Sequence, residues 1–433
     1  MKILVAGAGI GGLYAAYLFG KRGHAVTVYE RANGPEEMRY DWHDDVNPEA
    51  FLLRGLKIPE GSFPKKDWTF ISPCGNVLEM RQSEKNKDFS IERREINKYL
   101  CGLASEYADV VFGSTVSGAY VDGGRVAGLC FSDGKIEKCD LVIDCAGVDS
   151  AVRKSLPVTF GIDGEIEKEG VFCAYRAFYD AVEGEKAEYS NKVYMKHCGK
   201  NGISWCIVDD DSTKVDVLIG RIGKLGKEEL TEGLTELKKD NPVLGETVKR
   251  GGVVCRIPVR RPLDTFVADG YVALGDSACM TVPLIGSGIA TSLAGASILY
   301  EVAAELNSAP AEKLWEYEKR VYDAFGAEHC GVDYMKKWLL SRKNSDVDFL
   351  LGSGVLSNSD LQEVSVGRLI KPTFKEIVSK IRAVGLMRLH KLLPLAFMLM
   401  RTQRIVKIAK KIPSVYDEAK IAKWENALDK ACG

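Results

Sequence analysis

The amino-acid sequence predicts an α/β protein with more than one domain, and three observations support this prediction. The chain has 433 residues, and at about 150 residues per domain this length suggests two or three hydrophobic cores. At the N-terminus, a short apolar run, a glycine turn, an apolar helix pattern and a second apolar run follow one another, as in a parallel sheet. Further on, residues 168–222 read as a run of strands, and residues 331–433 read as helices.

The N-terminal segment has the spacing of a dinucleotide-binding turn. Its first apolar strand ends at Gly7, which permits the tight turn. Gly9 lets the backbone approach a pyrophosphate at the helix N-terminus, and Gly12 lets the helix pack on the sheet. The second strand ends on Glu30, which can accept hydrogen bonds from both ribose hydroxyls. A purely steric glycine turn is the alternative, but the strand, the helix and the acid all fall at the spacing that favours cofactor binding.

Two later segments determine which dinucleotide fits. Residues 144–153 follow a buried strand and read Asp-x-x-Gly-x-x-Ser-x-Val-Arg. A second strand ends in a Gly-Asp turn, and a small-residue helix over 289–306 follows it. The residues of this last signature are Gly275, Asp276, Pro283, Gly286 and Gly288. Together with the glycine turn, these segments resemble the signatures of the FAD enzymes built like p-hydroxybenzoate hydroxylase. Within that family the chain is most similar to the geranylgeranyl reductase group and its electron-transfer-flavoprotein quinone reductase relatives.

This resemblance implies an FAD cofactor and assigns residues to its parts. Asp276 is expected to hydrogen-bond the ribityl chain. The Pro283, Gly286 and Gly288 segment is expected to bring backbone N–H groups to the pyrimidine edge of the flavin. The N-terminus of the following helix supplies the positive potential that an anionic reduced flavin requires. Arg93 begins an Arg-x-x-hydrophobic helix start, which the resemblance places near FAD; a solvated arginine at a helix end is the alternative.

The resemblance also implies a Rossmann-like FAD-binding domain with an inserted antiparallel-sheet substrate domain and a C-terminal helical region. We expect the FAD-binding domain to be discontinuous, with segments 1–50, 90–160 and 255–330. The expected substrate domain comprises 51–89 and 161–254, and the helical region comprises 331–433. Within the substrate domain, the alternating pattern predicts strands over 171–179, 192–196, 203–208 and 215–221 and a helix over 227–239.

Small departures in the Gly-Asp signature distinguish two chemistries of this family. Hydroxylases usually carry a histidine where this chain has Cys279 and an asparagine where it has Ala290. Geranylgeranyl reductases carry small residues there, as this chain does. We therefore expect hydride transfer from reduced flavin to the carbon–carbon double bonds of an isoprenoid or other apolar substrate. An electron-transfer flavoprotein that serves a quinone and an FAD monooxygenase are the alternatives.

The substrate site is expected beside Trp205. Geranylgeranyl reductases carry a Tyr-x-Trp-x-Phe-Pro stretch that lines a lipid tunnel. Here Trp205 is kept, Ile203 replaces the tyrosine, and Ile207 with Val208 replaces the Phe-Pro pair. The stretch remains apolar, which suits a lipid substrate. A core-facing tryptophan on an alternating strand is the alternative.

Residues 39–46 are expected to form a loop against the flavin ring. The resemblance places Trp42 near the cysteine and Asp44 near the glutamate of the reductases' Cys-Gly-Glu-Gly loop. Alkene reduction needs a proton donor opposite the hydride, and His43, Asp44 or Tyr40 could supply it. A solvated acidic loop that leads into a helix N-terminus is the alternative. No metal site is expected, because no further ligand cluster accompanies the acids and the histidine of this loop.

Charge and cysteine content limit the partners and the compartment. The 59 Lys and Arg residues balance 60 Asp and Glu residues, so the sequence gives no reason to expect a nucleic-acid partner. The twelve cysteines are scattered without a CxxC pair, which favours free thiols in a reducing cytosol. No uninterrupted apolar run reaches the ~18 residues of a spanning helix, so we expect a cytoplasmic protein. Without a second glycine fingerprint, the electron donor is expected to be transiently bound NAD(P)H or a ferredoxin-type protein.

Residues 368–412 differ in charge from the rest of the chain. They contain twelve Lys and Arg residues and one acid, a net charge of +11, so the remaining residues sum to -12. Apolar runs interleaved with basic residues suit a helix that lies on an anionic lipid surface, here the inner face of a membrane. A helical cap that packs on the FAD-binding domain and a docking face for an acidic electron donor are the alternatives.

Overall fold

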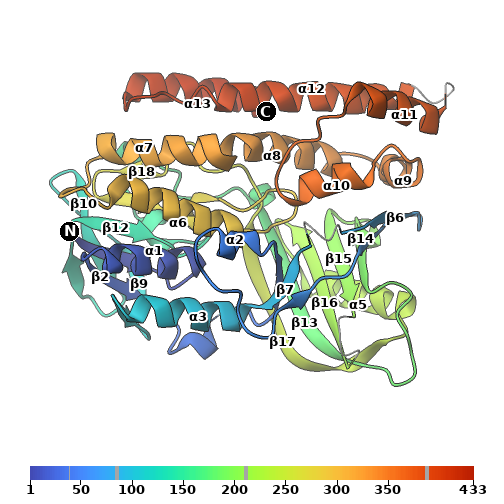
Figure 1. The fold of residues 1–433 in the computed structure, drawn as a ribbon, viewed down its shortest axis with the longest axis horizontal. Coiled ribbons are helices and arrows are strands. Elements are labelled where there is room, and N and C mark those ends of the chain that lie inside the picture. The colour runs from blue at the N-terminus through green and yellow to red at the C-terminus, as the bar shows by residue number, and fades with distance from the viewer. Residues whose placement is uncertain (39, 83–86, 209–212, 386–389) are drawn as a thin grey trace.

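The computed structural model describes residues 1–433 except 39, 83–86, 209–212 and 386–389. Figure 1 shows two lobes side by side and a layer of C-terminal helices that lies across them. One lobe holds the N-terminus and a mainly parallel sheet, and the other holds a larger, mainly antiparallel sheet. The predicted fold class is confirmed: a Rossmann-like α/β region, separate antiparallel sheets and C-terminal helices.

A six-stranded sheet forms the centre of the parallel-sheet lobe. In spatial order its strands are β18 (Val267–Ala268), β19 (Tyr271–Ala273), β12 (Leu141–Asp144), β1 (Lys2–Ala6), β2 (Ala25–Tyr29) and β8 (Asp109–Val111). Every neighbouring pair is parallel except β18 with β19. The apolar side chains of β1 and β12 are fully buried, as expected when both faces of a parallel sheet are covered.

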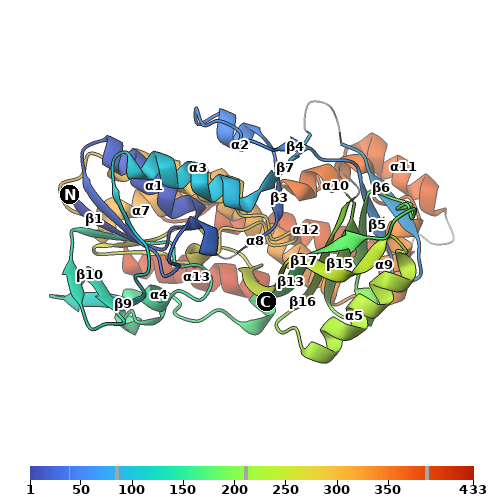
Figure 2. The ribbon, with the colours of Figure 1, turned by 90° about the horizontal axis from the view of Figure 1, so that it is seen from below.

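Helices cover one face of this sheet, and a three-stranded meander covers the other (Figure 2). The helices are α1 (Ile10–Lys21), α3 (Arg93–Ser105) and α6 (Ile289–Ala303), and the meander consists of β9 (Val116–Asp122), β10 (Arg125–Phe131) and β11 (Ile136–Lys138). This covering leaves the carboxyl ends of the parallel strands as the open edge, where ligands bind in such sheets.

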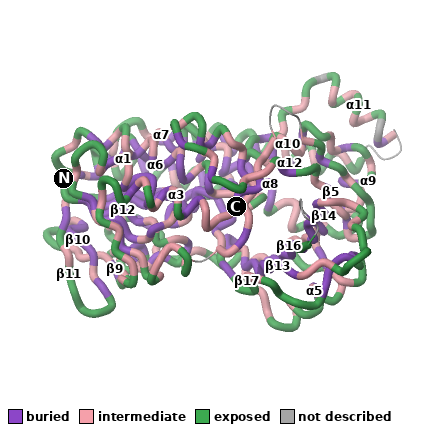
Figure 3. The backbone as a smooth tube through the Cα atoms, turned by 60° about the horizontal axis from the view of Figure 1, so that its bottom comes forward, coloured by how far each residue is buried: buried purple, intermediate pink, exposed green. Residues whose placement is uncertain are grey.

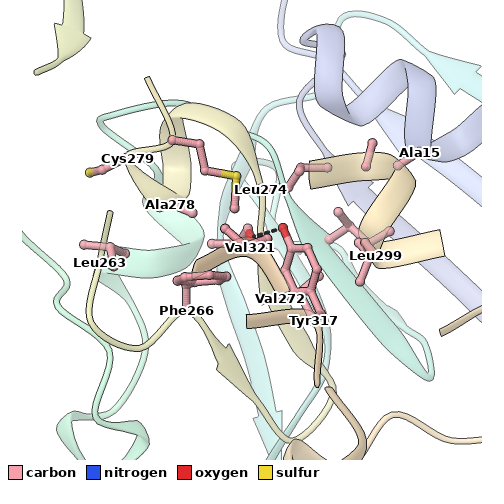
Figure 4. Close-up of a cluster of buried hydrophobic side chains, with 14 of the residues drawn as sticks. Ala15, Leu263, Phe266, Val272, Leu274, Ala278, Cys279, Leu299, Tyr317 and Val321 are labelled. Carbon is pink, nitrogen blue, oxygen red and sulfur yellow. Dashed lines mark hydrogen bonds between the residues drawn. The ribbon is translucent and has the colours of Figure 1, made fainter. Parts of the chain in front are cut away.

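A cluster of buried apolar side chains holds the Gly-Asp turn in place (Figure 4). Phe266 and Leu274 lie against Tyr317 of α7 (Ala311–Val321), and the Tyr317 hydroxyl donates a hydrogen bond to the carbonyl of Ala273 at 3.2 Å. Each of these three side chains is almost completely buried. The turn that begins at Gly275 therefore leaves a strand whose end is rigidly packed.

A seven-stranded sheet forms the antiparallel-sheet lobe. In spatial order its strands are β17 (Leu244–Pro258), β13 (Val171–Ala181), β16 (Lys214–Ile222), β15 (Gly202–Ile207), β14 (Asn191–Met195), β5 (Trp68–Ile71) and β6 (Val77–Met80). The helix α5 (Lys227–Asp240) packs on one face, where Leu237 meets Val217 and Ile219. The four strands and the helix predicted for this region are confirmed to within about two residues. The long edge strand β17 runs across the expected boundary between the substrate domain and the FAD-binding segment 255–330.

A small sheet joins the two lobes, and it corrects one prediction. Its strands are β3 (His43–Val46), β7 (Phe89–Glu92) and β4 (Phe63–Pro64). The prediction of a loop over 39–46 was wrong for 43–46, which pair antiparallel with β7, His43 opposite Glu92 and Val46 opposite Phe89. Adjacent aspartates disfavour a strand locally, but pairing with a distant segment overrides this propensity.

Helices make up the C-terminal part of the chain. After α7 they are α8 (Ala327–Leu340), α9 (Asn344–Gly352), α10 (Asn358–Ser365), α11 (Phe374–Val384), α12 (Leu392–Ala409) and α13 (Glu418–Cys432). The helix α12 packs between α8 and α13, with Ile405 and Ala409 fully buried, whereas α11 projects from the end of the molecule (Figure 3). Within the described part of the chain, none of the helices combines the length and the hydropathy needed to cross a bilayer.

Candidate functional site

One cavity of about 920 Å³ connects the two lobes and the C-terminal helices. Its lining runs from the glycine turn of β1 and α1, past the Gly-Asp turn and the joining sheet, to the large sheet and the helices α8, α9, α10 and α12. The cavity has three parts: a glycine end, a middle section and an apolar chamber.

The glycine end is shaped by close backbone contacts. Gly7 has a φ of +97°, and a Cβ there would lie 2.5 Å from the carbonyl oxygen of Cys145. Gly12 does not line the cavity; a Cβ on it would lie 2.4 Å from the carbonyl oxygen of Gly7, so it permits the packing of α1 on the sheet. Gly9 and Glu30 both line the cavity. This turn presents backbone N–H groups at a helix N-terminus, which suits a pyrophosphate.

Glu30 is held by the backbone at the end of β2. Its carboxylate accepts hydrogen bonds from the backbone N–H of Ala8 at 2.9 Å and of Ala32 at 3.0 Å. The remaining acceptor capacity of the carboxylate faces the cavity, which suits ribose hydroxyls.

The segment 144–153 is hydrogen-bonded to the Gly-Asp turn through Ser277. Asp144 is fully buried and accepts hydrogen bonds from the hydroxyls of Ser150 at 2.5 Å, Tyr271 at 2.9 Å and Ser277 at 3.1 Å. Arg153, also fully buried, donates to the carbonyl oxygens of Ser277 and Val148 at 2.6 Å. The sequence pattern identifies this signature but predicts no role for its residues. In the structure it is a buried polar network that fixes the turn carrying Asp276.

The Gly-Asp signature forms the next part of the lining. Asp276, Gly286 and Gly288 line the cavity, whereas Pro283 lies between two lining residues and does not line it. Burial raises the pKa of the Asp276 carboxyl to about 6, and the nearby Arg93 guanidinium acts in the opposite direction. The helix α6 begins directly after Gly288, so its N–H groups and its dipole are directed toward the cavity.

The middle section consists of Tyr40, Trp42, Asp44 and Arg93, which all line the cavity. Asp44 accepts a hydrogen bond from Arg93 Nε at 2.5 Å and one from the indole Nε1 of Trp42 at 3.1 Å. The Tyr40 ring lies 4.7 Å from the Trp42 ring, and the Arg93 guanidinium lies over it at 5.1 Å. These contacts hold two aromatic rings and an ion pair against one another beside Asp276.

His43 lies on the other face of β3 and does not line the cavity. Its Nε2 lies 3.2 Å from a carboxylate oxygen of Glu92, and its Nδ1 lies 3.4 Å from the hydroxyl of Ser90. Its ring also meets the rings of Phe63 and Phe178 edge-on. Successive residues of a strand point to opposite faces, so β3, which brings Asp44 to the cavity, directs His43 away from it.

The apolar chamber lies between the large sheet and the C-terminal helices. Trp205 and Ile203 line it, and Ile207, which is 1% exposed, is buried elsewhere in the sheet and does not line it. The other chamber residues of the sheet are Phe70, Leu78, Val193, Met195 and Leu218, and those of the helices are Trp338, Leu339, Leu350, Leu351, Leu361, Val364, Leu395 and Met398. The C-terminal helices thus form one wall of the chamber, a role that was not predicted from the sequence. The apolar side chains of α12 that face the chamber, such as Leu395 and Met398, are the sequence feature that could have indicated it.

The residues that line the cavity fit an FAD cofactor. The cavity has backbone N–H groups and an acid at the glycine end, and a second acid and a helix N-terminus at the Gly-Asp turn. It is also long enough to connect these groups to two aromatic rings of the middle section. Within the described residues, no group of three His, Cys, Asp or Glu side chains is placed to hold a metal ion.

Comparisons with known proteins agree with this architecture. The family model of an NAD(P)-binding Rossmann-like domain matches residues 5–37. Digeranylgeranylglycerophospholipid reductase 1 of Methanococcoides burtonii is 25% identical over 394 residues, which cover 86% of this chain and 91% of the relative. Digeranylgeranylglycerophospholipid reductase of Sulfolobus acidocaldarius is 21% identical over 84% of this chain and 82% of the relative.

Solved structures share the fold over most of the chain. A geranylgeranyl bacteriochlorophyll reductase-like protein of Thermoplasma acidophilum matches with a TM-score of 0.74 and 18% identity, covering 92% of this chain and 98% of its own. A probable FAD-dependent monooxygenase of Pseudomonas aeruginosa matches with a TM-score of 0.58 and 19% identity, covering 80% and 99%. The comparisons therefore confirm that the chain resembles the geranylgeranyl reductase group among the p-hydroxybenzoate hydroxylase-like flavoproteins.

Proposed function

We propose that the protein is an FAD-dependent oxidoreductase that reduces carbon–carbon double bonds of an isoprenoid lipid. The observation that carries this proposal is the cavity that joins the glycine end to the apolar chamber. A dinucleotide bound at one end and an apolar chain bound at the other would meet at the middle section. The relatives named as digeranylgeranylglycerophospholipid reductases cover most of the chain and support the same activity.

The residues that would hold FAD are distributed along the first half of the cavity. Gly7 and Gly9 leave space for the pyrophosphate, Glu30 accepts from the adenosine ribose, and Asp276 accepts from the ribityl chain. The segment from Gly286 to Gly288 and the start of α6 bring N–H groups to the edge of the flavin. When bound and reduced, FAD supplies a hydride.

The protein must also supply a proton, and the middle section offers Tyr40 and Asp44. Both oxygens of Asp44 already accept hydrogen bonds, from Arg93 and Trp42, so Asp44 is suited to positioning these groups. The hydroxyl of Tyr40 is therefore the better donor. His43 faces away from the cavity, so this geometry does not favour it as a donor.

The helix α12 suits contact with an anionic membrane surface from which a lipid enters the chamber. Leu395 and Met398 line the chamber, whereas Leu393, Phe397 and Met400 on the same helix are 58%, 64% and 56% exposed. Exposed basic residues on and directly beside this helix include Lys391, Arg401, Arg404, Lys407, Lys410 and Lys411. Exposed apolar side chains flanked by basic ones match the pattern of interfacial helices. The electron donor is proposed to be NAD(P)H or a ferredoxin-type protein.

A single experiment tests the activity. The purified protein, its flavin reduced anaerobically with dithionite, is mixed with a digeranylgeranyl glycerolipid, and we expect rapid flavin reoxidation and a saturated lipid by mass spectrometry. Reoxidation by a quinone with no saturated lipid would support an electron-transfer flavoprotein instead. A hydroxylated product formed only with oxygen would support a monooxygenase.

A further inference from the structure

Arg176 is a charged residue in an otherwise apolar wall. It lies on β13, and the other cavity-lining residues of β13, β14, β15 and β16 are apolar or aromatic. Its side chain is only 6% exposed. A guanidinium in such surroundings has lost most of its hydration, so each of its N–H groups needs an acceptor from the protein or from a ligand.

Two contacts hold the guanidinium of Arg176 in one orientation. Asp216 on β16 accepts hydrogen bonds from its Nε at 3.0 Å and its Nη2 at 2.5 Å. The rings of Trp42 and Trp205 lie 5.3 and 4.8 Å from its central carbon. Among the residues that the structure describes, none accepts a hydrogen bond from Nη1. The fork is thus fixed, and its remaining donor lies on a residue of the cavity wall, next to the middle section.

Stability does not account for this arrangement. Taking a carboxylate and a guanidinium out of water is costly, and apolar residues of similar size often replace a buried ion pair without loss of stability. Arg176 lines the cavity, and its Nη1 makes no hydrogen bond to a described residue. A ligand in the cavity would supply the missing acceptor, so the pair is better explained by recognition.

The surrounding charges determine which acceptor fits. Each cation of this region is paired with a carboxylate: Arg93 with Asp44, Lys65 with Asp45 and Arg176 with Asp216. The acids Asp88 and Asp276 line the same cavity in addition. A phosphate or carboxylate of a ligand would therefore meet an excess of like charge. An uncharged oxygen can accept from Nη1 without this repulsion.

We infer that Arg176 determines substrate specificity by donating a hydrogen bond from Nη1 to an uncharged oxygen, such as an ether or ester oxygen, of the isoprenoid substrate. The inference rests on the reductase function proposed above and deepens it by naming the substrate class. The oxygen lies at the guanidinium between Trp42 and Trp205, and the isoprenoid chain extends into the apolar chamber. A plain hydrocarbon leaves the donor unpaired, and a free diphosphate places charge beside the acids.

The test compares three probes on the FAD-loaded protein: a geranylgeranyl alkyl ether, the hydrocarbon in which CH2 replaces the ether oxygen, and geranylgeranyl diphosphate. Affinities are measured by quenching of tryptophan fluorescence, and kcat/KM is measured with dithionite as reductant. We expect the wild type to favour the ether over the hydrocarbon by on the order of ten- to a hundredfold, the worth of a hydrogen bond to a charged group. It should favour the ether over the diphosphate as well.

Two variants assign this preference to Arg176. In the double variant Arg176→Leu with Asp216→Leu, both charges are removed together, and the ether-to-hydrocarbon ratio should fall to about one. Arg176→Lys keeps a cation beside Asp216 but lacks the second arm of the fork, so the ratio should fall here too. The matched control Ile219→Val lies on the other face of β16, against α5, and should keep the wild-type ratio.

The inference is overturned if the wild type binds the hydrocarbon or the diphosphate as tightly as the ether. It is also overturned if either Arg176 variant, with wild-type FAD content and melting temperature, keeps the preference. Binding of the ether without any reduction would contradict the proposed function alone, because the binding ratio still tests Arg176.

Discussion

Asp44 connects the groups at the centre of the cavity. One of its oxygens accepts from Arg93 and the other from Trp42, so the ion pair also fixes the indole ring. Tyr40 has a φ of +75°, a backbone conformation that bulky residues rarely adopt. Residues in such strained conformations are found most often at functional sites. This residue is thereby placed over Arg93 and beside Trp42, which supports its proposed role as proton donor.

Replacing Tyr40 by phenylalanine tests this role. Tyr40→Phe removes the hydroxyl and keeps the ring that contacts Trp42 and Arg93. We expect lipid saturation to slow by about 10²-fold, a typical worth of a positioned proton donor, with FAD content unchanged. Single-turnover reoxidation of the reduced flavin by the lipid measures this rate. The control His43→Gln alters a neighbouring residue that faces away from the cavity and should keep the wild-type rate of flavin reoxidation. If His43→Gln were slow and Tyr40→Phe were as fast as the wild type, His43 and not Tyr40 would be the proton donor.

The strand β7 connects the lobes through Glu92, its last residue. The Glu92 carboxylate meets His43 of β3 at 3.2 Å and Arg250 of β17 at 2.5 Å. Burial of this carboxyl acts to raise its pKa, but the hydrogen bonds from His43 and Arg250 prevail and lower the pKa to about 2. The folded state therefore favours the carboxylate, which joins β3 and β7 of the joining sheet to β17 of the antiparallel-sheet lobe.

Because the pKa of Glu92 is lowered on folding, the ionised pair stabilises the protein above pH ~4.5, and this contribution is lost as the pH falls toward 2. Its size is on the order of 2–3 kcal/mol. We expect Glu92→Gln to have a lower free energy of unfolding than the wild type at pH 7. At pH 3 the difference in free energy of unfolding between the two proteins should be smaller. Urea denaturation at both values measures this, with Glu228→Gln at the exposed start of α5 as control. An equal difference at both values would contradict the assignment.

The helix α12 carries apolar side chains on two faces. One face lines the apolar chamber with Leu395 and Met398, and the other exposes Phe397 and Met400. A surface helix of a protein that meets only water is normally polar on its outer face. This exposed apolar face is the basis of the membrane contact proposed above.

Charged substitutions on α12 test membrane contact. We expect Phe397→Glu with Met400→Glu to lower co-sedimentation with phosphatidylglycerol vesicles by at least about tenfold, since both buried apolar area and charge attraction are reduced. Binding of the wild type should weaken with salt and with uncharged lipid. The control Val158→Glu changes a side chain that is 93% exposed elsewhere on the molecule and should bind as wild type does. Equal binding of all three proteins would exclude this surface.

At the scale of the whole molecule, both lobes, the joining sheet and the C-terminal helices meet at one cavity. The parallel-sheet lobe supplies the glycine end and, at the start of α3, Arg93. The joining sheet and the residues just before it supply the rest of the middle section, and the large sheet and the C-terminal helices supply the apolar chamber. A ligand that fills the first two parts touches the parallel-sheet lobe and the joining sheet. Its binding energy therefore adds to the stability of both.

Removal of FAD should lower the melting temperature of the whole protein. At a concentration of 100 times its Kd, a ligand stabilises the folded state by about 2.7 kcal/mol, which corresponds to several degrees for a chain of this size. Calorimetry before and after removal of the flavin, followed by its return, measures this shift. Adenosine diphosphate alone should restore only part of it, because it reaches only the glycine end. An unchanged melting temperature would contradict binding of FAD in this cavity.

Local patterns predicted the fold and the start of the site because they are encoded within short segments. The conformations of the turn from Gly7 to Gly12 and of the segment from Asp276 to Gly288 are set by steric limits among residues that are close in sequence. The strands and the helix of the antiparallel-sheet lobe follow from their own apolar periodicity. The predictions for 43–46 and for His43 depended on pairing with a distant segment, which makes 43–46 a strand and decides which face His43 occupies. Ile207 lies on the same face of β15 as Ile203 and Trp205, so its place outside the lining depends on where along the strand the cavity ends.

The sequence by itself determined the fold class, the dinucleotide turn and the resemblance to flavin-dependent reductases, because each depends on residue types at short, fixed spacings. Only the tertiary structure placed Arg176 between Trp42 and Trp205, turned His43 away from the cavity and made the C-terminal helices a wall of the apolar chamber. These features join residues that lie far apart in the chain. Their proximity is set by sheet register and by packing between the lobes, which no local pattern encodes.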